Sequence, residues 1–202
     1  MKTYREVLLD YIPKASVSSV LEFLNTSNVQ LKITKSRTTK LGDYRPPIRS
    51  KHHKISINHD LNKYHFLVTL IHEFSHLDTW EKHHRKVKPH GKEWKQTFRE
   101  LMTPYLNEAI FPEDILIVLQ KFLKNPTSSS VDTDLTKKMR EYDTSKNYFT
   151  LEELPDDSIF KIHNGVIFKK LERIRKRYKC RRMDNNRIYL ISPIMEVIPV
   201  VD

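Results

Sequence analysis

The sequence predicts an α+β protein in which helices pack on a small sheet and a small all-β module follows. Two observations carry this prediction. Over the first 124 residues, apolar residues recur at helical spacing in several segments, and short alternating segments lie between them. From residue 159 onward, the pattern changes to short apolar runs separated by turn residues. The chain has 202 residues, of which 38% are hydrophobic and 30% charged, so it contains enough apolar material for a core.

The N-terminal segments predict a helical region and then a sheet. Residues 4–25 have helical spacing, with a break near Pro13. Three short strands are expected after them: "QLKIT" at 30–34, "TTKLGDY" at 38–44 with a bend at Gly42, and "HKISIN" at 53–58. The first segment alternates polar and apolar residues as a half-buried strand does, and the third places Ile55 and Ile57 on one face.

Three helices are predicted to follow the strands. The first covers residues 61–80, where the apolar residues follow helical spacing. A polar, histidine-rich loop at 81–90 separates it from a second helix, which begins after Gly91. Pro112 is placed to precede or start a third helix that runs to residue 122.

The segment "NPTSSS" at residues 125–130 is the clearest boundary in the chain, because it is rich in proline and serine and has no apolar residue. We therefore expect a first domain at 1–124 and a linker at 125–150 that can contain a polar helix at 132–142. A basic β module is expected at 151–202, with a hairpin turn at Asn164-Gly165.

The net charge of +11 favours acidic partners, and nucleic acid is the first of these. Ten Lys and Arg side chains fall between residues 169 and 187, against two acidic ones. A solvated basic face that keeps the protein soluble is an equally good interpretation. The residues that would contact nucleic acid are Lys169, Lys170, Arg173, Arg175, Lys176, Arg177, Lys179, Arg181 and Arg182.

Several features favour the cytoplasm and no membrane association. The longest apolar run, at residues 115–119, is too short to span a bilayer, and the N-terminus lacks the apolar core of a signal peptide. Cys180 is the only cysteine, so the chain can form neither an internal disulfide nor a cysteine-only zinc site.

The segment "TLIHEFSHLDTW" contains the pattern of a metal-binding helix. His72 and His76 are four residues apart, so on a helix both imidazoles project from one face. Two such nitrogens can bind one Zn²⁺ ion, and the carboxylate of Glu73 can act as a general base on water activated by the metal. The alternative is a core helix whose histidines have ordinary hydrogen-bond partners, but unpaired imidazoles are costly to bury in so apolar a segment.

His90, in "KPHGKEW", is the best candidate for a third ligand. A turn built from Pro89 and Gly91 could present it at the start of the next helix, which would leave a fourth position open for water, as catalytic zinc requires. The other candidates for this position are His83, His84, Glu93 and Glu100. The metzincin pattern is excluded, because Thr79 and Lys82 stand where it needs Gly and His.

"KLGDYRP", "KISIN", "TLIHEFSHL" and "PHGKEW" follow one another in the order of SprT-like domains, the zinc metallopeptidase-like domains of SprT and Spartan. The chain resembles this family over residues 16–102. The resemblance implies a minimal zincin-like fold, one zinc ion per chain held by His72, His76 and His90, and Glu73 as the base. It also implies that Trp94 packs beneath the ligand loop.

The resemblance implies a peptidase that acts on protein or peptide substrates, with proteins attached to DNA as the substrates of Spartan-like relatives. Many SprT-type proteins carry a zinc ribbon with paired cysteines after the peptidase domain, whereas this chain has Cys180 alone. The β module is therefore interpreted as a ribbon relative that has lost its metal. The rival hypothesis is a non-catalytic nucleic-acid-binding protein with a structural or inactive zinc site.

Overall fold

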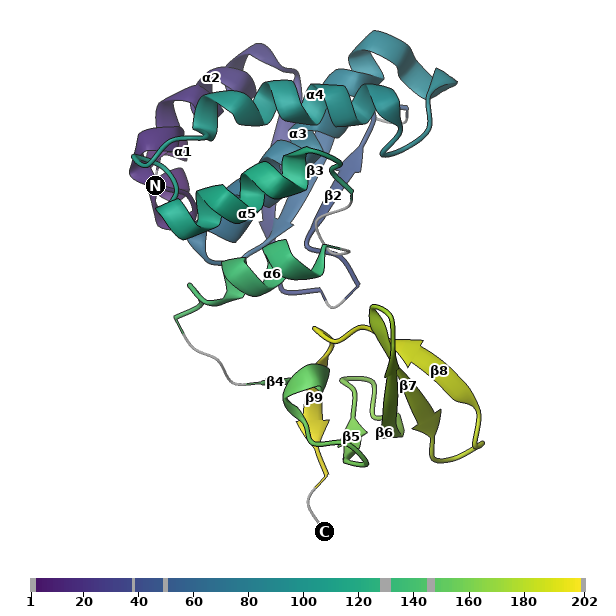
Figure 1. The fold of residues 1–202 in the computed structure, drawn as a ribbon. Helices are drawn as coiled ribbons and strands as arrows, with labels where there is room; N and C mark the ends of the chain where they lie inside the picture. Colours follow the sequence, from purple (N-terminus) through teal and green to yellow (C-terminus); the bar gives the residue numbers. More distant parts are fainter. Residues whose placement is uncertain (1–2, 38, 49–50, 128–131, 145–147, 201–202) are drawn as a thin grey trace. The chain divides into compact units, whose positions relative to one another are not determined.

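The computed structural model describes residues 3–37, 39–48, 51–127, 132–144 and 148–200 (Figure 1). The chain forms two compact units, residues 1–143 and 144–202. The first is an α+β unit and the second an all-β unit, so the predicted fold class is confirmed. Among the described residues, no helix is both long enough and apolar enough to span a bilayer. Residue 38 of the predicted second strand, residues 128–131 and 145–147 of the predicted linker, and residues 201–202 of the predicted β module lie outside the described residues.

A three-stranded sheet lies in the first unit, with strand order β1-β3-β2. Strand β1 (Val29–Thr34) runs parallel to β3 (His53–Asn58), and β2 (Gly42–Arg45) runs antiparallel to β3. Alternate residues of β3, including Ile55 and Ile57, are buried toward the helices. The intervening residues lie on the opposite, polar face. Successive residues of β2 also point to opposite faces, so this strand contributes both to the side that faces the helices and to the polar face.

Helix α3 (Lys63–His83) forms the centre of the first unit and is contacted by β2, β3 and α4. The side chain of Asn62 caps its N-terminus by accepting hydrogen bonds from the amides of Tyr64 and His65. Thirteen of its 21 residues are buried, so its apolar stripe is wider than that of a surface helix. The helix continues past the predicted end at residue 80, since neither Gly nor Pro interrupts it before His84, whose φ is 51°.

The other helices surround α3 in Figure 1. They are α1 (Tyr4–Tyr11), α2 (Val17–Thr26), α4 (Lys92–Met102), α5 (Glu113–Leu123) and α6 (Thr133–Arg140). Four short 3-10 helices are Lys14–Ser16, His84–Lys86, Thr103–Tyr105 and Leu151–Glu153. The break near Pro13 separates α1 from α2 as predicted, and Pro112 precedes α5.

The boundary of the first unit lies later than the sequence predicts. Helix α6 was expected in a linker, but Leu135 and Met139 are 2% and 0% exposed and belong to the core of the first unit. The side-chain amide of Asn62 also donates hydrogen bonds to Met139 O and Asp143 Oδ1, both at 2.7 Å. Although the composition of α6 is polar, the burial of Leu135 and Met139 makes this helix part of the first domain.

The second unit is a six-stranded antiparallel sheet with strand order β4-β9-β5-β6-β7-β8. Its strands are β4 (Phe149–Thr150), β5 (Ile159–Lys161), β6 (Ile167–Ile174), β7 (Arg177–Arg182), β8 (Ile188–Ile191) and β9 (Glu196–Pro199). Its core includes Leu151, Phe160, Cys180 and Val197. The basic run at 169–187 contributes most of the β6–β7 hairpin, with a register shift between Lys170 and Arg173.

Candidate metal centre

Three histidine side chains meet at one point of the first unit. The Nε2 atoms of His72, His76 and His90 form a triangle with sides of 3.2, 3.0 and 3.0 Å. A tetrahedral zinc site with Zn–N bonds of about 2.0–2.1 Å would separate its nitrogens by about 3.4 Å. The triangle is therefore within a few tenths of an ångström of the size that zinc requires. Among the described residues, it is the one cluster of three or more His, Cys, Asp or Glu able to hold a metal ion.

The chemistry of the triangle also fits a cation. Each Nε2 atom carries either a hydrogen or a lone pair in the ring plane. Three such atoms cannot all be arranged as donor–acceptor pairs around a triangle. Without a cation, two hydrogens or two lone pairs therefore face each other along at least one side. A metal ion that accepts all three lone pairs removes this conflict. The residues present can therefore hold a metal ion.

The environment keeps the three imidazoles neutral. Burial holds the pKa of His72 well below its usual value, and the charges that His76 and His90 would carry lower it further. Burial, together with His90, lowers the pKa of His76 to about 3. Burial and the nearby Lys95 also lower the pKa of His90. Neutral imidazole is the form that binds metal, so no proton needs to leave at neutral pH.

His90 reaches the triangle from a tight turn. The amide of Gly91 donates to Lys88 O at 2.9 Å, with Pro89 and His90 at the two central positions. His90 has a φ of 55°, as the third residue of a type II turn requires, although Gly or Asn is the usual residue there. A Cβ at Gly91 would lie 2.8 Å from Lys88 O, so only glycine allows this turn to close without a shift. The sequence predicted this turn from Pro89 and Gly91.

Trp94 supports the ligand rings from one turn into α4. Its side chain is fully buried, and its ring centroid lies 4.6, 5.3 and 4.6 Å from those of His72, His76 and His90. It also stacks on Phe98 at 5.2 Å. The rings of the cluster therefore rest on a rigid aromatic floor, and the predicted packing role of Trp94 agrees with these contacts.

The other candidate ligands lie elsewhere. In the part of the chain that the structure describes, His83, His84, Glu93 and Glu100 do not join the cluster. His84 contacts Trp80 edge-on at 5.8 Å, and Glu100 accepts a hydrogen bond from Gln96. Because α3 continues to residue 83, His83 lies two turns, or about 10 Å, further along the helix axis than His76.

The SprT-like family model matches residues 14–111, a segment that contains α2, the whole sheet, α3 and α4 with all three histidines. This segment belongs to the SprT-like family. The family suggests a metallopeptidase-like domain with a metal cofactor. Searches of curated proteins and of solved structures gave no significant match to the chain.

Glu73 of the SprT-like domain is buried against strand β2. A Cβ at Gly42 would lie 2.4 Å from Glu73 Oε1, so the absence of a side chain at Gly42 makes room for the carboxylate. Burial, together with the charge of Asp43, raises the pKa of Glu73 to about 8. Arg37, Lys40 and a hydrogen bond from the Tyr44 amide oppose this shift. A carboxylate with a raised pKa is a stronger base, which suits proton transfer near neutral pH.

Tyr44 connects the candidate metal centre to a chain of polar side chains that the sequence did not reveal. Its ring stacks on that of His76 at 6.2 Å, with an interplanar angle of 8°. Its hydroxyl lies 2.9 Å from Nδ1 of His53, and Nε2 of His53 lies 2.9 Å from Glu81 Oε1. The Glu81 carboxylate can only accept, so His53 Nε2 carries the hydrogen and Tyr44 donates to Nδ1. These contacts fix the position of β2 beside His76.

The nine side chains of the second unit that were predicted to contact nucleic acid differ in their exposure to solvent and in their ion pairs. Lys170 is 2% exposed and donates to Leu154 O at 2.6 Å, so it does not face solvent as expected. Within the hairpin it lies on the same face of β6 as the buried Phe168. Three others form ion pairs within the unit: Lys169 with Asp157, Lys179 with Glu172, and Arg182 with Asp184. Arg173 lies 5.7 Å from the ring of Tyr178.

The remaining cations, Arg175, Lys176, Arg177 and Arg181, are exposed around the β6–β7 hairpin. Cys180 is fully buried in the same hairpin, and burial raises the pKa of its thiol to about 11. A buried thiol with a raised pKa is a small core residue rather than a nucleophile.

Proposed function

We propose that the SprT-like domain is a zinc-dependent peptidase with one zinc ion bound by His72, His76 and His90. The observation that carries this proposal is the triangle of Nε2 atoms, next to a buried carboxylate on the same helix. A purely structural site has no need of Glu73. The three ligands leave a fourth position for water or substrate, as catalytic zinc sites do.

The chain's own residues supply the rest of the chemistry. When bound, zinc supplies Lewis acidity for the scissile carbonyl and lowers the pKa of water in the site. Glu73 would accept a proton from the attacking water on a carboxylate oxygen and deliver it to the leaving amine nitrogen. Gly42 and the Tyr44 amide hold that carboxylate in place. Trp94 keeps the ligand rings fixed while the proton moves.

The resemblance to Spartan-like domains supports DNA-associated proteins as the substrates. The exposed cations of the second unit would contact phosphates and hold such a substrate nearby. The alternative function is a nucleic-acid-binding protein whose zinc site is structural, and the exposed basic side chains are the observation in its favour.

The Glu73→Gln variant separates these two functions. We expect it to retain zinc and to lose at least about a hundredfold in peptide hydrolysis, because a general base contributes about 10²–10⁴. The measurement is cleavage of a quenched fluorescent peptide library by the zinc-loaded full-length protein. Glu100→Gln, an exposed carboxylate on α4, is the matched control and should hydrolyse at the native rate. A native protein that binds zinc but hydrolyses no faster than Glu73→Gln would favour the structural alternative.

A further inference from the structure

The polar face of the β1–β3–β2 sheet, on the side opposite α3, carries an unusual concentration of charge. It contains a hollow of about 450 Å³. The charged side chains that line it are four cations and one carboxylate, namely Lys32, Arg37, Arg45, Lys54 and Asp43. Lys40 adds a further cation, since its ammonium lies 2.7 Å from Asp43 Oδ1. A single carboxylate thus faces five positive side chains.

Two of these cations have no counterion. The ammonium group of neither Lys32 nor Lys54 has a hydrogen-bond or ion-pair partner among the residues that the structure describes. The register places Lys54 between Gln30 on β1 and Arg45 on β2. Like charges directly opposite each other on neighbouring strands are destabilising. A bound anion would remove that repulsion.

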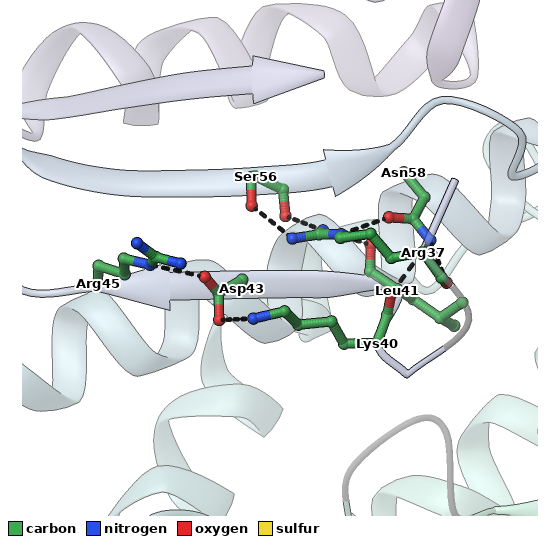
Figure 2. Close-up of polar contacts among 7 residues, drawn as sticks. All are labelled: Arg37, Lys40, Leu41, Asp43, Arg45, Ser56 and Asn58. Atoms are coloured by element: carbon green, nitrogen blue, oxygen red, sulfur yellow. Dashed lines mark hydrogen bonds and ion pairs between the residues drawn. The ribbon is translucent and has the colours of Figure 1, made fainter. Parts of the chain in front are cut away.

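Part of the positive charge is held rigidly, as Figure 2 shows. The guanidinium of Arg37 donates to Asn58 Oδ1 at 2.8 Å, to Ser56 Oγ at 3.0 Å and to Ser56 O at 3.2 Å. The Asn58 amide in turn donates to the carbonyl oxygens of Arg37 and Lys40, which fixes the loop before β2. Asp43 lies between Lys40 and Arg45 and accepts from both. A ligand would therefore meet several donors already in position.

The chemistry of the face points to phosphate groups. Ammonium and guanidinium groups, with the hydroxyl of Ser56 and the amide of Gln30, are the donors that proteins use for phosphate and sugar oxygens. The lining offers no exposed aromatic or apolar anchor, which a peptide ligand generally needs. We propose that this face of the SprT-like domain binds the phosphate backbone of a nucleic-acid strand, without reading its sequence.

The proposed surface lies directly behind the metal centre. On strand β2, the side chains of Asp43 and Arg45 point to the basic face. On the other face of the same strand, Gly42 lies against Glu73 and the ring of Tyr44 lies against that of His76. One strand thus separates the bound phosphates from the site of hydrolysis. The inference does not need the peptidase activity, because binding to this face would occur with an inactive metal centre as well.

The test is binding of a fluorescein-labelled single-stranded oligonucleotide of mixed sequence, followed by anisotropy over a range of salt concentrations. It uses the full-length Glu73→Gln protein, so hydrolysis plays no part in the result. We expect Lys32→Gln with Lys54→Gln to weaken binding at least about tenfold at low salt, and to reduce the magnitude of the slope of log K against log salt by about 1.4, because each phosphate contact contributes about 0.7 on a single strand. Neither lysine has a described partner, so the replacement removes no native contact.

The matched control is Lys14→Gln with Lys124→Gln, which removes the same charge from exposed positions of the first unit that lie outside the sheet and have no described side-chain partner. Its affinity should stay within about twofold of the parent protein. The proposal is overturned if the parent protein does not bind at low salt. It is also overturned if the control loses as much affinity as the sheet variant, or more, because binding would then respond only to the total charge of the protein.

Discussion

At the scale of single residues, the two glycines of the SprT-like domain solve two separate steric problems. Gly42 lets strand β2 approach Glu73, where a Cβ would lie 2.4 Å from the carboxylate. Gly91 lets the turn close that presents His90. Both roles concern close contacts rather than backbone freedom, since neither glycine has a positive φ. The strained φ belongs to His90 itself, a residue whose side chain is needed at that point.

Buried His65 predicts a pH dependence of stability. Burial lowers the pKa of His65 to about 4, and the charge of Arg140 contributes in the same direction, against Asp60. In the unfolded chain the pKa is near 6.5, so below that pH the unfolded state binds a proton that the folded state rejects. Stability is therefore lost as pH falls from 6.5 towards 4. Between pH 7 and pH 5 this loss is about 2 kcal/mol.

The measurement is urea unfolding of the native protein and of His65→Leu at both pH values. The difference between them isolates His65, because the histidines of the metal centre are present in both proteins. The native protein should lose about 2 kcal/mol more than the variant on acidification. Equal losses in the two proteins would mean that His65 is protonated in the fold and that its burial has been misjudged.

The three histidines of the candidate metal centre could be predicted from local sequence patterns. His72 and His76 follow from their four-residue spacing, and His90 from its Pro-Gly turn. The Tyr44–His53–Glu81 chain could not be predicted in this way, because its members lie on two strands and a helix and only the register brings them together. The sequence contains no local signal for such a contact.

At the scale of elements, helix α6 shows how composition misleads about domain boundaries. Its sequence is polar and follows a Pro/Ser-rich segment, so it resembles a linker helix. Two buried residues, Leu135 and Met139, nevertheless attach it to the core, and its last turn provides partners for Asn62, the cap of α3. The basic hairpin misled in the opposite direction, because strand alternation buries Lys170 within a run that composition describes as a solvated face.

Truncation tests the assignment of α6. A chain that ends after Asp143 should retain the stability of the first unit, whereas one that ends after Asn125 should not. The shorter chain loses the burial of Leu135 and Met139, worth about 1.5–3 kcal/mol each, and the partners of the Asn62 amide. We expect it to melt at least about 10 °C lower, measured by circular dichroism. Equal melting temperatures of the two truncated chains would mean that α6 does not stabilise the first unit and belongs to the linker.

At the scale of the whole molecule, the SprT-like domain carries two candidate sites on opposite sides of one small sheet. The face toward α3 positions the candidate metal centre, and the polar face carries the unpaired cations. The order of elements and the fold class were predictable because each segment has one dominant period. The polar face was not predicted, since its charges come from three strands and a loop that are scattered along the sequence.

The most direct test of the central claim is the zinc content of the purified full-length protein, measured by elemental analysis beside His90→Ala and His83→Ala. If the three facing imidazoles form a metal centre, the native protein and His83→Ala will each hold about one zinc ion per chain, and His90→Ala will lose most of it at sub-micromolar free zinc. The claim is contradicted if the native protein takes up no zinc after incubation with the metal, or if His90→Ala retains the native content.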